Sequence, residues 1–107
     1  MFTIHYFSET VRLEVAALSL EMRARYAVYT ERMKQFGANL GMPHSRAMGG
    51  GLFELRLKDG SGIARVFYCV VHERRIVMLH SFIKKTQVTP KRELDIARRR
   101  KKEMDHA

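Results

Sequence analysis

Residues 52–102 decide the fold, with the sequence LFELRLKDGSGIARVFYCVVHERRIVMLHSFIKKTQVTPKRELDIARRRKK. Three apolar runs, at residues 52–57, 63–71 and 75–83, are separated by turn sequences. Apolar and polar residues alternate in the first run, which is typical of a strand with one buried face. The third run is apolar at successive positions, as in a strand covered on both faces. Because short turns join them, the first of which contains two glycines, these runs are predicted to form consecutive antiparallel strands.

The end of this stretch is predicted to be a strongly basic helix. Thr89 followed by Pro90 is a favoured N-cap and first-turn pair, so we expect a helix over residues 90–102. Residues 84–102 contain nine cations and two anions, a net charge of +7. Positive charge gathered in one segment is typical of a surface that contacts nucleic acid.

The first half of the chain is predicted to add one strand and two helices. Residues 1–7 are rich in aromatic and β-branched side chains, which favours a strand. Ser8 and Ser19 are placed to cap the two helices, the second ending near residue 36. An apolar stripe follows this second helix at Met22, Tyr26, Tyr29, Met33 and Phe36. Residues 38–51 contain four glycines and are predicted to be a loop.

The expected order is therefore β-α-α-β-β-β-α. This is an α+β fold, in which a largely antiparallel, four-stranded sheet packs against an N-terminal helical hairpin and a basic C-terminal helix. The 107 residues of the sequence fit one domain, 1–107.

Composition limits where such a protein would work. The net charge is +9, which favours a polyanionic partner. Cys69 is the single cysteine, so no intramolecular disulfide is expected and a reducing compartment is favoured. The first residues lack a signal-peptide pattern, and no apolar run reaches the ~18 residues of a membrane span. We therefore expect a cytoplasmic protein without membrane contact.

The expected element order, together with the segments LFELR, GIARVFY and LHSFIKKTQVTP, resembles the RelE/HigB superfamily of bacterial toxins. The similarity is greatest to its phage-derived, HigB-like branch and extends over nearly the whole chain. The resemblance implies a RelE-like fold and a toxin of a type II toxin–antitoxin system. It also implies cleavage of mRNA in the ribosomal A site, and neutralisation by a helix-turn-helix, HigA-like antitoxin.

Four cations in or just after the strands are candidates to hold the RNA phosphate. Arg56 and Arg65 should lie on the same face of adjacent strands, where their planar guanidinium groups suit phosphate oxygens. Lys84 and Lys85 follow the last strand, and the sequence leaves open which of them points inward. Such cations would stabilise the charge that develops on the phosphate during metal-free cleavage.

Proton transfer is harder to assign from the sequence. His80 is the best imidazole candidate, but a histidine on an apolar strand is more often a hydrogen-bonded core residue. Glu54 is either a general base or the salt-bridge partner of Arg56. We expect Arg65→Ala to abolish growth arrest while leaving the fold intact.

The remaining basic residues are predicted to contact RNA or the ribosome. They are Arg46, Arg92, Arg98, Arg99, Arg100, Lys101 and Lys102. We expect no metal and no cofactor, because the histidines lack ligand spacing and the glycines at 49–51 lack a phosphate-loop pattern.

Two other functions are compatible with the same features. A ParE-like gyrase inhibitor would poison its target by binding, without chemistry. A non-catalytic RNA-binding module, or a degenerate toxin, would use the same basic surface. The set of cations on the sheet favours the ribonuclease over both.

Overall fold

The computed structural model describes residues 1–84 and 88–106 of the chain. Within these ranges the elements are, in order, β1 (Thr3–Tyr6), α1 (Glu9–Ala16), α2 (Leu20–Phe36), β2 (Ser45–Gly49), β3 (Leu52–Asp59), β4 (Gly62–Val71), β5 (Arg75–Lys84) and α3 (Lys91–Asp105). The α+β class is confirmed. None of the helices in these ranges is long and apolar enough to cross a lipid bilayer.

The elements form one five-stranded sheet in the order β1-β5-β4-β3-β2. Strands β2 to β5 pair with their neighbours in antiparallel fashion, and β1 pairs with β5 in parallel. The predicted sheet had four strands, whereas the structure has five. The additional strand is β2, which lies inside the segment predicted to be a loop. Its sequence, SRAMG, is short, ends in glycine and lacks the β-branched alternation of a strand. Backbone pairing with the edge of β3 holds it in place.

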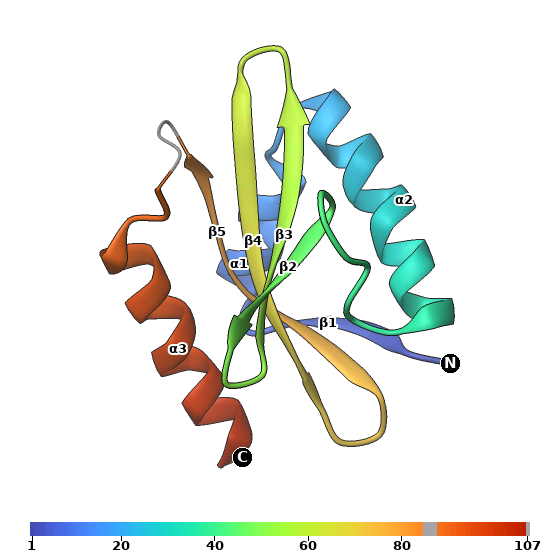
Figure 1. The fold of residues 1–107 in the computed structure, drawn as a ribbon, viewed down its shortest axis with the longest axis vertical. Coiled ribbons are helices and arrows are strands. Elements are labelled where there is room, and N and C mark those ends of the chain that lie inside the picture. Colours follow the sequence, from blue (N-terminus) through green and yellow to red (C-terminus); the bar gives the residue numbers. More distant parts are fainter. Residues whose placement is uncertain (85–87, 107) are drawn as a thin grey trace.

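Helices cover both faces of the sheet (Figure 1). Helices α1 and α2 pack on one face, where Val11, Val15, Met22 and Met33 join side chains of β3, β4 and β5 in one apolar core. Helix α3 lies on the other face, where Ala97 packs with a second apolar cluster. The helical hairpin and the basic C-terminal helix are thus placed on opposite sides.

Local sequence signals explain how the first two helices begin and end. The Ser8 and Ser19 hydroxyls accept hydrogen bonds from the backbone N–H groups of Val11 and Met22, which confirms both predicted N-caps. Gly37 ends α2 with a φ of 99°, a left-handed value that glycine adopts without a Cβ penalty. Phe36 departs from the predicted apolar stripe, because its side chain is 79% exposed.

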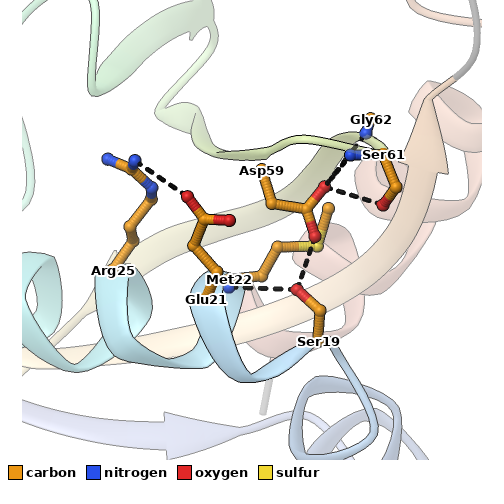
Figure 2. A network of polar contacts seen from close by, with 7 residues as sticks. All are labelled: Ser19, Glu21, Met22, Arg25, Asp59, Ser61 and Gly62. Atoms are coloured by element: carbon orange, nitrogen blue, oxygen red, sulfur yellow. Dashed lines mark hydrogen bonds and ion pairs between the residues drawn. The ribbon is translucent and has the colours of Figure 1, made fainter.

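A polar contact ties the start of α2 to the β3–β4 turn (Figure 2). The Ser19 hydroxyl donates a hydrogen bond of 2.6 Å to Oδ2 of Asp59. Oδ1 of Asp59 accepts hydrogen bonds from the backbone N–H and the hydroxyl of Ser61, both at 2.7 Å, and from the N–H of Gly62 at 3.0 Å. Asp59 therefore fixes its own turn and also links it to the helical hairpin.

Candidate functional site

The sheet face under α3 gathers the predicted cations. Arg56 and Arg65 lie directly opposite each other across β3 and β4, so their side chains leave the same face, as predicted. Arg46 on β2 lies opposite Glu54 on β3, and Lys84 on β5 lies opposite Ile63, near the start of β4. We call Arg46, Arg56, Arg65 and Lys84 the cationic cluster. Lys85, the fourth cation predicted to hold the phosphate, lies outside the described residues.

A buried carboxylate lies within the cationic cluster. Glu54 is 1% exposed, and its Oε1 accepts a hydrogen bond of 3.1 Å from Nη1 of Arg65. Its Oε2 accepts one of 3.1 Å from the hydroxyl of Thr89. The expected salt bridge of Glu54 with Arg56 was therefore wrong. In this arrangement Arg65 occupies one carboxylate oxygen and Thr89 the other, which leaves Glu54 poorly placed to act as a base.

This use of Thr89 also changes the start of α3. The predicted N-cap role of Thr89 was wrong: Pro90 is the N-cap, and it provides no side-chain hydrogen bond. The Thr89 hydroxyl instead links Glu54 to Lys84, whose Nζ lies 3.5 Å from it. The segment before α3 is thereby attached to the sheet through the buried carboxylate.

The members of the cationic cluster differ in how accessible they are. Arg65 and Lys84 are buried, with 2% and 7% exposure, whereas Arg56 is half-buried and Arg46 is exposed. Burial lowers the pKa of Arg65; Glu54 opposes this shift and Arg56 adds to it. Burial also lowers the pKa of Lys84, and Arg65 lowers it further. A ligand would meet Arg46 and Arg56 first, with Arg65 and Lys84 behind them.

His80 lies beside the cluster and pairs with α3. Its Nε2 is 3.0 Å from Oε2 of Glu93, a residue that the sequence did not indicate as part of a site. Leu79 is an extra residue in the β4–β5 pairing, and this irregularity brings His80 opposite Phe67. The ring of Phe82 stacks on both, with centroids 5.9 Å from His80 and 5.7 Å from Phe67.

Two buried nitrogens on this face have no hydrogen-bond partner. They are Nδ1 of His80 and Nε of Arg65, and among the described residues they are the only buried side-chain nitrogen or oxygen atoms in this condition. An unpaired buried donor or acceptor costs free energy, so proteins normally keep few of them. Their occurrence together at one place is a feature of functional sites.

The basic residues of α3 fall into two groups. Arg100 donates a 2.7 Å hydrogen bond to the carbonyl of Leu79 and lies over the Phe7 ring. Arg98 bonds the carbonyls of Met48 and Gly49 at 2.9 and 3.3 Å, and Lys101 pairs with Asp105 at 2.6 Å. These three side chains therefore make contacts within the protein, and their predicted contact with RNA stays a prediction. The other predicted residues are exposed to solvent: Arg92, Arg99 and Lys102.

The other titratable groups do not form a site on this face. Over residues 1–84 and 88–106, no His, Cys, Asp or Glu side chains are grouped so that three of them could hold a metal ion. Cys69 is fully buried, and burial raises the pKa of its thiol to about 11. The thiolate that a nucleophile requires is therefore disfavoured near neutral pH.

Sequence reasoning missed Thr89 and Glu93 for a common reason. Both lie at the start of α3, where hydroxyl and acidic side chains are ordinary helix-start signals. Their true partners, Glu54 and His80, are 35 and 13 residues earlier in the chain. Only the way α3 packs on the sheet brings these pairs together.

One protein-family model matches most of the chain. The model of the family described as phage derived protein Gp49-like (DUF891) matches residues 14–102, which include α2, β2 to β5 and most of α3. No curated protein matches the sequence. The matched segment contains the cationic cluster, Glu54, His80 and Glu93. The chain therefore belongs to the family of phage-derived Gp49-like proteins, a family associated with the toxins of toxin–antitoxin systems.

Proposed function

We propose that the protein is the toxin of a type II toxin–antitoxin system and acts as a ribosome-dependent mRNA endoribonuclease. The observation that carries this proposal is the imbalance of charge on the sheet face under α3. Four cations, Arg46, Arg56, Arg65 and Lys84, lie around the carboxylate of Glu54, which offsets one of their charges and leaves an excess of three. A phosphodiester backbone is the cellular polyanion that best fits such an excess.

The cations would act on the phosphate from two depths. Arg46 and Arg56 are accessible and would contact its oxygens directly. Arg65 and Lys84 lie behind them, where the low dielectric strengthens their effect on the charge that develops during cleavage. Glu54 holds Arg65 in place, so these charges need no reorganisation when the phosphate becomes more negative.

The chemistry would be attack of the ribose 2′ oxygen on the adjacent phosphorus. The bond from phosphorus to the 5′ oxygen breaks, giving a 2′,3′-cyclic phosphate and a 5′-hydroxyl end. We assign removal of the 2′-OH proton to Nδ1 of His80, which has no hydrogen-bond partner among the described residues, while Glu93 orients the ring through Nε2. His80 then returns the proton to the leaving 5′ oxygen, directly or through water.

The test is to induce the protein in bacteria and map 5′-hydroxyl ends on translated messages. Wild type should stop growth and create new ends inside coding regions. Arg56→Ala should lose both effects, because it removes an accessible cation that would contact the phosphate. The variant should still fold, since Arg56 is half-buried and no described residue forms an ion pair with it. Arg32→Ala is the control, since it removes one exposed arginine from α2, which packs on the opposite face of the sheet.

Each other outcome excludes the proposal in a specific way. Growth arrest with broken DNA and intact messages would indicate a ParE-like gyrase inhibitor. Normal growth with intact messages, from a folded protein, would indicate a non-catalytic RNA-binding module. Undiminished cleavage by Arg56→Ala would remove the cationic cluster from the mechanism.

The role of His80 has a separate test. His80→Gln should abolish message cleavage while leaving association with ribosomes unchanged, because the amide cannot exchange the proton. Glu93→Gln should reduce cleavage less, since the imidazole remains. Equal cleavage by wild type and His80→Gln would assign the proton transfer to another group.

A further inference from the structure

A positively charged hollow lies at the edge of the sheet, between α2 and β3. It has a volume of about 280 Å³, and its lining residues are Arg25, Tyr29, Pro43, His44, Arg56, Lys58 and Ile63. The pairing of β2 with β3 begins at Ser45 and Leu55, and the N–H of Arg56 bonds the carbonyl of His44. Beyond that point the edge of β3 has no neighbouring strand, which leaves room for the hollow. We call it the edge cavity.

The edge cavity continues from the cationic cluster through one residue. Arg56 belongs to the cluster, where it lies opposite Arg65, and it also lines the cavity. Among the described residues, Arg56 is the one that belongs to both the cationic cluster and the edge cavity. A chain whose phosphate contacts Arg56 would therefore have its adjacent nucleotide at the cavity.

The charges of the edge cavity suit a phosphate. Arg25, Arg56 and Lys58 contribute three cations, and none of the lining residues is acidic. Arg25 does pair with Glu21 at 3.4 Å, but both side chains are about half exposed. Because an exposed pair of this kind contributes little, Arg25 remains available to a stronger anion.

The walls of the edge cavity suit a nucleobase. The rings of Tyr29 and His44 lie with their centroids 4.7 Å apart and their planes at 43°. Tyr29 is only 8% exposed, so the core holds it, while His44 is half-buried and reaches the surface. Pro43 and Ile63 add apolar surface. Flat rings beside cations are the usual means of binding single-stranded nucleic acid, because every base has a face that can stack.

We propose that the edge cavity binds one nucleotide of single-stranded RNA, next to the phosphate held at Arg56. The base lies against the rings of Tyr29 and His44, and Arg25 and Lys58 contact the phosphate that follows. The inference rests on the proposed function, since it extends the path of the message from the cationic cluster around the edge of the sheet. At about 280 Å³, the cavity has room for a single base and not for a longer segment.

The experiment measures binding of a fluorescent single-stranded RNA of about ten nucleotides, methylated at every 2′ oxygen so that it cannot be cleaved. Fluorescence anisotropy at several salt concentrations gives the affinity and its salt dependence. Arg25→Ala and Lys58→Ala should each lower the slope of log affinity against log salt by about 0.7, the value for one phosphate of a single strand. Arg32→Ala, two turns along α2 on the same helix face, should leave the slope unchanged.

The stacking part is tested at His44. His44→Ala should weaken binding at least fivefold, the lower range for loss of one base stack. His44→Phe should restore binding, because it keeps a flat ring without the imidazole. Far-ultraviolet circular dichroism of each variant checks that the fold is retained.

The results separate this inference from the proposed function. Equal slopes for Arg25→Ala, Lys58→Ala and Arg32→Ala, with normal RNA binding, would exclude the edge cavity and leave the ribonuclease proposal standing. Wild type that does not bind the RNA would also exclude it, while message cleavage in cells is judged independently. Loss of affinity in His44→Phe equal to that in His44→Ala would exclude base stacking.

Discussion

Glu54 and Arg65 form an ion pair with 3.1 Å between Oε1 and Nη1, and their side chains are only 1% and 3% exposed. This pair lies under α3, in the middle of the cationic cluster. It makes Arg65 a structural residue as well as a candidate for phosphate stabilisation. The expectation that Arg65→Ala would leave the fold intact conflicts with this burial.

The first prediction concerns the stability of this pair. Arg65→Ala leaves a buried, unpaired carboxylate and should lower the free energy of unfolding by about 3–5 kcal/mol. The double variant Glu54→Leu with Arg65→Met replaces both charges by apolar groups and should lose much less. Urea unfolding of wild type and the two variants gives the comparison. If the free energy of unfolding of Arg65→Ala lies within about 1 kcal/mol of the wild-type value, the carboxylate of Glu54 is not strongly desolvated.

The second prediction separates the two groups of cations on α3. Arg100→Ala should lower the free energy of unfolding by about 1.5–3 kcal/mol, because it removes a charged donor to the carbonyl of Leu79. Arg99→Ala should leave stability within about 0.5 kcal/mol, since its side chain is exposed. If Arg99 contacts RNA, its variant should also lower the salt slope of binding by about 0.7. The same stability for both variants would mean that Arg100 does not anchor the helix.

The third prediction concerns Tyr68, whose hydroxyl donates a 2.6 Å hydrogen bond to the carbonyl of Ala38. Burial raises the pKa of Tyr68 to about 12, against about 10 in an unfolded chain. The folded state therefore holds the Tyr68 proton more tightly, and this contribution to stability is complete below pH 10 and lost as the pH rises to about 12.

Thermal unfolding of wild type and Tyr68→Phe at several pH values checks this. Below pH 10, Tyr68→Phe should be less stable by about 1–3 kcal/mol, because the carbonyl of Ala38 loses its partner. The difference between the two proteins should shrink between pH 10 and 12. A difference that stays constant over this range would contradict the raised pKa.

The fourth prediction concerns acid stability. Hydrogen bonds from Ser19 and Ser61 lower the pKa of Asp59 to about 2, from an ordinary value of 3.8. The ionised carboxylate thus favours the folded state above pH 4, and this contribution is lost as the pH falls towards 2. Asp59→Asn should have a lower Tm than wild type at pH 5, with the gap closing by pH 2.

Asp95→Asn is the matched control for the acid experiment. Asp95 is exposed and pairs only with Lys91 among the described residues, at the surface of α3. Its variant should change the Tm little at any pH. A gap for Asp59→Asn no larger than that for Asp95→Asn would mean that the link between the β3–β4 turn and α2 adds no stability.

These relationships decide how the site should be tested by mutation. Arg56 is the cation of choice, because it is half-buried and lines the edge cavity, so its loss need not unfold the protein. Arg65 is informative only in the double variant with Glu54. Arg100 must be kept apart from the exposed arginines, since a loss of function there would reflect the position of α3.

The sequence by itself determined most of the strands, the capped starts of α1 and α2 and the shared face of Arg56 and Arg65. These features follow from local rules: side chains alternate along a strand, and a short glycine turn sets which residues of two strands lie opposite each other. The exception was β2, a short edge strand whose residues have little preference for extended structure and which exists because β3 provides a partner.

Only the tertiary structure decided which of these charged groups meet and which remain accessible. The pairs of Glu54 with Thr89 and of His80 with Glu93 join β3 and β5 to the start of α3. Their members are 35 and 13 residues apart, and no helix or strand periodicity predicts a contact at these separations. Their formation depends on the extra residue Leu79 in β5 and on the face that α3 turns to the sheet. Burial under a packed helix is a property of the whole assembly, and it converts four similar cations into two accessible and two buried ones.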